Sequence, residues 1–163
     1  FDIGGEVGLV NIDNVSLIVG AGNLLTNGDF ENGSDPWIIG VDDNSPAPVV
    51  TNNGNTYYSV DVLSAGNVYD VNMSQKIEII EGNTYTLTFD AWSDRSRTIV
   101  AGIGLSGPPW TNTGATLEIA TTRTTFTFTY STVGFGASDA RVLFDIGGEV
   151  GLVNIDDVSL SLN

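Results

Sequence analysis

The side chains of this chain that could do chemistry are carboxylates, amides, hydroxyls and aromatic rings, because histidine and cysteine are both absent. Without cysteine there is no disulfide, no thiol nucleophile and no structural zinc–cysteine site. Without histidine the base of a Ser-His-Asp triad is missing. The candidates that remain are polar and aromatic side chains that bind a ligand, and oxygen atoms that hold a hard cation such as calcium.

The charge balance narrows the class of ligand further. The chain has 20 acidic and five basic residues, which gives a net charge of −15 at pH 7. A protein binds nucleic acids or anionic membranes through clustered cationic side chains, which this chain lacks, so neither is an expected partner. A neutral ligand or a cation suits this surface better. No apolar run reaches the roughly 18–20 residues of a membrane-spanning helix.

The elements that must position these side chains follow a period of two. In "TYTLTFDAWS", residues 84–93, one face carries Tyr85, Leu87, Phe89 and Ala91 and the other carries Thr86, Thr88, Asp90 and Trp92. This alternation is typical of half-buried strands, and Asn-Gly pairs supply turns between them. We therefore predict an all-β fold, a β-sandwich jelly roll of two antiparallel sheets. The expected strands are 8–18, 24–31, 37–41, 56–63, 72–80, 84–93, 97–105, 115–121, 124–131, 140–146 and 151–162, with a loop-rich segment over 32–55.

One segment occurs twice. Phe1–Leu17 returns as Phe144–Leu160 with a single change, Asn14 to Asp157. The offset of 143 residues is the size of a domain, which predicts a tandem array of modules. Residues 1–20 are then the closing strand segment and linker of a preceding module, and 21–163 form one module. We expect residues 1–17 either to pair within the chain or to enter a neighbouring chain as an exchanged strand.

Four stretches together resemble the family 4 carbohydrate-binding modules and their relatives in families 9, 16 and 22. They are "NLLTNGDFENG", "VYDVNMSQKIEIIEGNTYTLTFDAWS", "RTIVAGIGL" and "FDIGGEVGLVNIDDVSL". Asp70-Val71 before Ser74-Gln75 looks most like modules attached to β-1,3-glucanases such as laminarinases. The resemblance implies a jelly roll without catalysis of its own, a β-glucan or xylan chain bound in a cleft on the concave sheet, and a structural calcium ion near the two ends of the module.

A sugar ring needs two kinds of partner: a flat aromatic face for its C–H groups and planar polar groups for its hydroxyls. The candidates for these contacts are Tyr69, Trp92, Trp110, Gln75, Asp90, Arg97 and Trp37. Trp92 and Asp90 share the outward face of their strand, and Trp110 follows two prolines on a loop. Trp37 is favoured as a core or loop anchor, and Gln75 has the same parity as Ile77, so a structural role stays open for each.

The calcium site is a prediction from the resemblance. Glu31 and Asp156 would give side-chain oxygens, Asp29 a backbone carbonyl, and the turn after residue 51 a further oxygen, for which we choose Asn53. The repeat supports Asp156 over Asp157, because a charged ligand should not differ between the copies. The alternative is that these acids simply face solvent.

Catalysis is not expected. A glycosidase needs two carboxylates about 5–10 Å apart across a cleft, and no spacing singles out a pair among Asp61, Asp90 and Asp139. We therefore expect a non-catalytic module that binds a β-glucan, with β-1,3-glucan (laminarin) favoured, and that targets a secreted bacterial glycan-degrading protein. The alternatives are a xylan-, cellulose- or mannan-binding module, or a calcium-rigidified adhesive repeat of a cell-surface protein.

Overall fold

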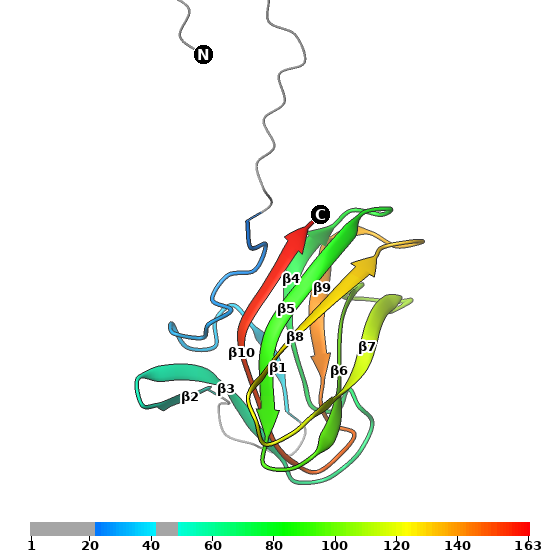
Figure 1. The fold of residues 1–163 in the computed structure, drawn as a ribbon. Helices are drawn as coiled ribbons and strands as arrows, with labels where there is room; N and C mark the ends of the chain where they lie inside the picture. The colour runs from blue at the N-terminus through cyan, green and yellow to red at the C-terminus, as the bar shows by residue number, and fades with distance from the viewer. Residues whose placement is uncertain (1–21, 42–48) are drawn as a thin grey trace, which may run out of the picture.

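A computed structural model describes residues 22–41 and 49–163, and these residues form two five-stranded antiparallel sheets (Figure 1). Sheet A has the order β1 (Ile38–Gly40), β4 (Asn72–Ile79), β9 (Ala137–Asp145), β6 (Arg97–Gly104) and β7 (Asn112–Ile119). Sheet B has the order β2 (Val49–Asn52), β3 (Asn55–Val62), β10 (Gly151–Leu162), β5 (Thr84–Ser93) and β8 (Thr124–Ser131). The predicted sandwich of two antiparallel sheets is confirmed. The described residues contain no helix, so none of them forms a helix that could cross a membrane.

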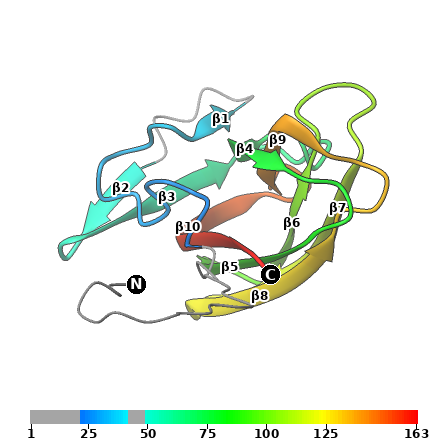
Figure 2. The same ribbon diagram turned by 90° about the horizontal axis from the view of Figure 1, so that it is seen from above.

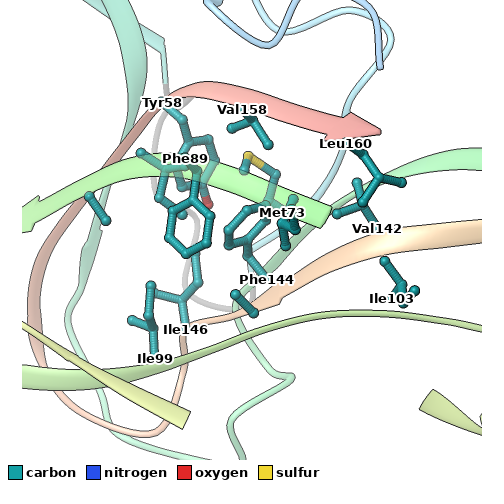
Figure 3. Close-up of a cluster of buried hydrophobic side chains, with 14 of the residues drawn as sticks. Tyr58, Met73, Phe89, Ile99, Ile103, Val142, Phe144, Ile146, Val158 and Leu160 are labelled. Atoms are coloured by element: carbon teal, nitrogen blue, oxygen red, sulfur yellow. The ribbon is translucent and has the colours of Figure 1, made fainter. Parts of the chain in front are cut away.

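The core between the sheets is built from the inward faces that the alternation predicts. Every second residue of β5 is buried, from Tyr85 to Ser93. Phe89 of sheet B meets Phe144 of sheet A edge to face, with ring centroids 4.9 Å apart. Figure 3 shows these rings with Met73 and Tyr58 among the aliphatic side chains of both sheets. Burial of this apolar surface is the main stabilising contribution to the fold.

Two segments differ from the sequence prediction. The expected strand 24–31 is a series of bends and turns, because Asn27 and Phe30 adopt positive φ angles of 50° and 54°, which interrupt the regular extended backbone. Conversely, the segment expected to be loop-rich contains β2, which pairs with β3 through a turn at Asn53-Gly54. Asn-Gly between two short strands is a strong hairpin signal, so this strand could have been found in the sequence.

The two ends of the described module lie side by side. The side-chain oxygen of Asn23 accepts a hydrogen bond from the amide of Leu160 at 2.9 Å, and the amide of Leu24 donates to the carbonyl of Leu160 at 2.8 Å. Figures 1 and 2 show the start of the module beside the end of β10. The segment 1–20, its boundary with the module and the expected strand exchange lie outside the described residues.

Candidate functional site: a cleft on sheet A

A hollow of about 580 Å³ lies on the outer face of sheet A. Its lining combines two aromatic rings, two amides, two charged groups and one aliphatic side chain: Tyr69, Trp110, Asn72, Asn112, Arg141, Asp145 and Leu143. The rings of Tyr69 and Trp110 are 60% and 51% exposed, so a ligand can reach them. Of the residues predicted to contact sugar, these are the two that the structure brings together.

Strand β9 supplies the floor of this hollow. Arg141, Leu143 and Asp145 alternate with the buried core residues Val142 and Phe144, so their side chains lie on the outer face. The sequence predicts a strand over 140–146, and the alternation along it could have identified Arg141, Leu143 and Asp145 as the outward face. Burial raises the pKa of Asp145, while Arg141 acts in the opposite direction.

Glycines make the wall beside this floor. Gly102 and Gly104 of β6 lie directly opposite Leu143 and Arg141 of β9. A Cβ added to Gly104 would lie 2.4 Å from Cβ of Asn112, so β7 approaches β6 too closely for any side chain there. This close approach leaves the hollow open and fixes the position of Asn112, which lines it.

The loop before β7 holds Trp110 in a defined place. Its amide donates to the carbonyl of Gly107 at 2.8 Å, and its own carbonyl accepts from Nδ2 of Asn112 at 3.1 Å. Its φ of 61° is a left-handed conformation that a bulky residue rarely adopts unless its surroundings enforce it. The guanidinium of Arg141 lies over the ring, with Cζ 5.5 Å from the centroid, so the ring and the charged group act as one unit.

Trp92 and Asp90 lie on the other sheet. Both side chains are on the outward face of β5, as the alternation predicts, but β5 belongs to sheet B. Trp92 packs against Tyr57, with ring centroids 4.9 Å apart, and under Arg123 at 5.0 Å. Asp90 accepts from Nε of Arg123 at 2.6 Å. These contacts occupy both residues and separate them from the hollow on sheet A.

The remaining three predicted sugar contacts, Trp37, Gln75 and Arg97, are buried. Trp37 and Gln75 therefore have the structural role that the sequence left open for them. Nε1 of Trp37 donates to the carbonyl of Asn27 at 2.9 Å, inside the core cluster. The side chain of Gln75 exchanges two hydrogen bonds with the backbone of Thr26, each 2.9 Å long. It therefore ties the bends at the start of the module to β4.

Arg97 also differs from its expected role, which was to donate hydrogen bonds to sugar hydroxyls. It is 2% exposed, and its guanidinium donates to the carbonyls of Ile146 and Gly151, on either side of the β9–β10 connection. A buried guanidinium that satisfies backbone carbonyls holds a loop and is unavailable to a ligand.

The predicted calcium ligands are brought together only in part. Oε1 of Glu31 accepts from the amide of Thr56 at 2.8 Å, and Oδ2 of Asp156 accepts from Nδ2 of Asn55 at 2.9 Å. The two carboxylates thus reach consecutive residues of β3 from the two ends of the described module. Asn55 occupies the place beside Asp156 that we had assigned to Asn53.

Other observations limit the predicted metal site. Asn53 lies at the exposed tip of the β2–β3 turn, and Asp29 lines a separate shallow hollow with Asp157. Arg123 already contacts Oδ2 of Asp156 at 3.0 Å. Within residues 22–41 and 49–163, no group of three or more acidic side chains is arranged to hold a metal ion. Backbone carbonyls and amide oxygens would have to complete the shell.

The single difference between the two copies has a structural explanation. Asp157 lies in the bulge of β10 with a φ of 49°, and its side chain is exposed. Asn and Asp are the residues other than glycine that tolerate this conformation best, so either residue type suits this position of β10. Asp156 is 1% exposed, and its counterpart in the first copy is also aspartate.

Comparison with known proteins identifies the class. Residues 22–149 match the family model CBM_4_9, described as a carbohydrate binding domain. The chain therefore belongs to the family 4-like carbohydrate-binding modules, and it is a non-catalytic binding domain. The resemblance drawn from the sequence motifs is confirmed.

Particular relatives agree with this family. A cellulose 1,4-β-cellobiosidase of Acetivibrio thermocellus is 32% identical over 123 residues, which are 66% of this chain but 13% of that protein. A structure described as "CBM4 structure and function" is 26% identical, with a TM-score of 0.72 over 85% of this chain and 99% of the other. The second N-terminal cellulose-binding domain of Cellulomonas fimi β-1,4-glucanase C is 20% identical, with a TM-score of 0.67 over 91% and 99% of the two chains. The last likeness supports the fold alone.

Proposed function

We propose that this module binds a β-glucan chain in the hollow on sheet A and so targets a secreted glycan-degrading protein to its substrate. The observation that carries the proposal is the pair of exposed rings, Tyr69 and Trp110, at a hollow lined by amides and by Arg141. The rings would stack on the apolar faces of glucose units, and the amides and the guanidinium would bind their hydroxyls. The parent protein is extracellular in this proposal.

The choice among β-glucans needs a direct assay. We favour β-1,3-glucan as the first ligand, because the motif around Gln75 resembles modules of β-1,3-glucanases. Gln75 is buried, however, so that motif has a structural use in this module. The relative from A. thermocellus is a cellulose 1,4-β-cellobiosidase, which makes a β-1,4-glucan the second ligand to test.

Affinity electrophoresis tests the proposal with laminarin, mixed-linkage glucan, a soluble cellulose derivative, xylan and glucomannan. Retardation by a β-glucan, lost in Trp110→Ala and kept in Trp92→Ala, supports it. Trp92 is the matched control because it is a half-buried tryptophan on the opposite sheet. If none of these glycans slows the module with calcium present, the targeting proposal fails and the adhesive-repeat alternative takes its place.

We also propose that Glu31 and Asp156 hold a structural calcium ion, with oxygens from Asn55 and the backbone completing the site. The ion would supply positive charge between the first and the closing segments of the module. Support comes from the two carboxylates that converge on β3. The proposed site is tested by measuring the melting temperature with calcium and with a chelator. The wild type should melt at a higher temperature with calcium, and this difference should disappear in Glu31→Gln.

The tandem array and the strand exchange complete the proposal. Linked copies would raise the local concentration of binding sites, so that weak single sites suffice for targeting. Strand β10 lies between β3 and β5 in the middle of sheet B. Residues 7–17 repeat the sequence of 150–160 except at position 157, so in this proposal they would enter sheet B by taking the place of β10.

A further inference from the structure

One end of the sandwich gathers exposed and partly buried apolar side chains around both ends of the module. A hollow of about 320 Å³ lies there, and its lining is Leu24, Ile80 and Leu162, together with Tyr85 and, from β4, Lys76, Ile77 and Glu78. Ile80 is 51% exposed, and Val133, on the neighbouring loop, is 79% exposed. Oγ1 of Thr132 donates to the carbonyl of Ile80 at 2.7 Å, which joins the two loops. We call Leu24, Ile80, Val133 and Leu162 the terminal pole.

The repeat fixes how far a neighbouring module can be from this pole. Leu17 is the counterpart of Leu160 in the preceding module, and Asn23 begins the next one. Within one module, Asn23 is hydrogen-bonded to Leu160 at the terminal pole. Six residue steps separate Leu17 from Asn23, so the two poles lie at most about 20 Å apart.

That distance is short compared with the module. Strand β10 has 12 residues, which corresponds to about 40 Å. The chain enters and leaves each module at the same end, so successive modules cannot form a straight string in which the chain passes from one end to the other. The short linker therefore keeps the terminal poles of successive modules close together, and each pole presents exposed apolar side chains, which water disfavours, beside Lys76 and Glu78.

We propose that neighbouring modules of the array dock on each other through the terminal pole, with a second copy of this module as the partner. This inference rests on the proposed tandem array but is independent of which glycan is bound. The lining of the hollow on sheet A includes Tyr69, Asn72 and Asp145, which lie at the other end of β4 and β9. Docking at the poles therefore leaves the hollows on sheet A open, and these hollows face away from the contact between the modules.

A two-module protein tests this directly. Residues 23–160 are placed ahead of residues 18–163, which keeps the native junction, and the rotational correlation time is measured by NMR relaxation. Docked modules tumble together, with the correlation time of one body of twice the mass. Ile80→Lys in both modules should lower the value close to that of the 163-residue chain, and Val133→Lys is a second variant at the same pole.

The control lies at the opposite end. Leu63 is 66% exposed and follows Val62, which pairs with the first residue of β10. Leu63→Lys should leave the modules docked. Independent tumbling of the unsubstituted modules, or an equal effect of the substitutions at both ends, would overturn the inference. Retention on β-glucan is measured for the same proteins. If the pole variants tumble independently but are still retained on β-glucan, the docking inference and the glycan proposal are tested separately.

Discussion

The close approach of β7 to β6 gives the prediction that depends most directly on the geometry of the cleft. In Gly104→Ala the new Cβ would lie 2.4 Å from Cβ of Asn112 and 2.8 Å from the carbonyl oxygen of Thr111. Carbon atoms in ordinary contact are about 3.5–4.0 Å apart, so β7 must recede by about 1 Å. Asn112 and Trp110, which are joined by a hydrogen bond, must move with it.

The expected loss can be stated for both stability and binding. Overpacking a rigid site costs about 1–3 kcal/mol, which corresponds to a fall in melting temperature of roughly 2–10 °C for a domain of this size. A displaced Trp110 would lose part of its stacking energy, which is about 1–3 kcal/mol for aromatic platforms. Loss of all of this energy would raise Kd roughly 5- to 150-fold, so a partial loss raises Kd by less.

Gly107→Ala is the matched control for this substitution. Gly107 lies in the loop between β6 and β7, and a Cβ added there would meet nothing within 4 Å. We expect its stability to stay within about 0.5 kcal/mol of the wild type. Thermal unfolding and isothermal titration with the best β-glucan ligand measure both effects. Equal stability and equal affinity of the two alanine variants would refute the reasoning.

Three further predictions concern the core, the metal and the repeat. Arg97→Met should lower the free energy of unfolding by about 2–5 kcal/mol, because two buried carbonyls lose their hydrogen-bond donor. A loss of glycan affinity at unchanged stability would instead support the ligand role expected from the sequence. Burial raises the pKa of Asp156, and calcium needs the ionised carboxylate, so the difference in melting temperature with and without chelator should shrink as the pH falls; a difference that stays constant down to pH 4 would exclude Asp156 as a ligand. Deletion of residues 1–20 should abolish any dimer formed by strand exchange, and a dimer that survives in sedimentation analysis would require another interface.

The sign of the acid dependence follows from the same group in the metal-free protein. The pKa of Asp156 is higher in the folded state than in the unfolded chain. Its protonated form is therefore the one that folding favours, and its contribution to stability is lost as the pH rises through the folded pKa. Calcium would reverse this cost at neutral pH by pairing with the carboxylate.

Much of the fold could be predicted because local pattern and tertiary environment agree. The period of two in residues 84–93 survives as alternate burial, and the predicted strand 151–162 is β10 to the residue. The prediction of a strand over 24–31 was wrong because tertiary contacts determine that segment. Gly28 lies so close to β10 that an added Cβ would be 1.9 Å from the carbonyl oxygen of Val158, and no periodicity reports such an approach.

The candidate site was harder to predict because parity assigns a side chain to a face but not to a sheet. Trp92 points outward as expected, but it lies on sheet B, whereas the hollow is on sheet A. Residue type was equally ambiguous for Arg97, which is charged and buried. Arg141 and Asp145 carried a readable signal, because they have the parity opposite to Phe144 on a strand that was predicted.

The measurement that tests the account most directly is an NMR titration of the 163-residue chain with β-glucan oligosaccharides of each linkage. We predict that the largest shifts fall on the indole Nε1 of Trp110 and the side-chain amides of Asn72 and Asn112, all at the hollow on sheet A. The indole signal of Trp92 should stay unchanged. Shifts centred on Trp92 and Tyr57, or none with any of the oligosaccharides, would contradict the proposal that this hollow binds the glycan.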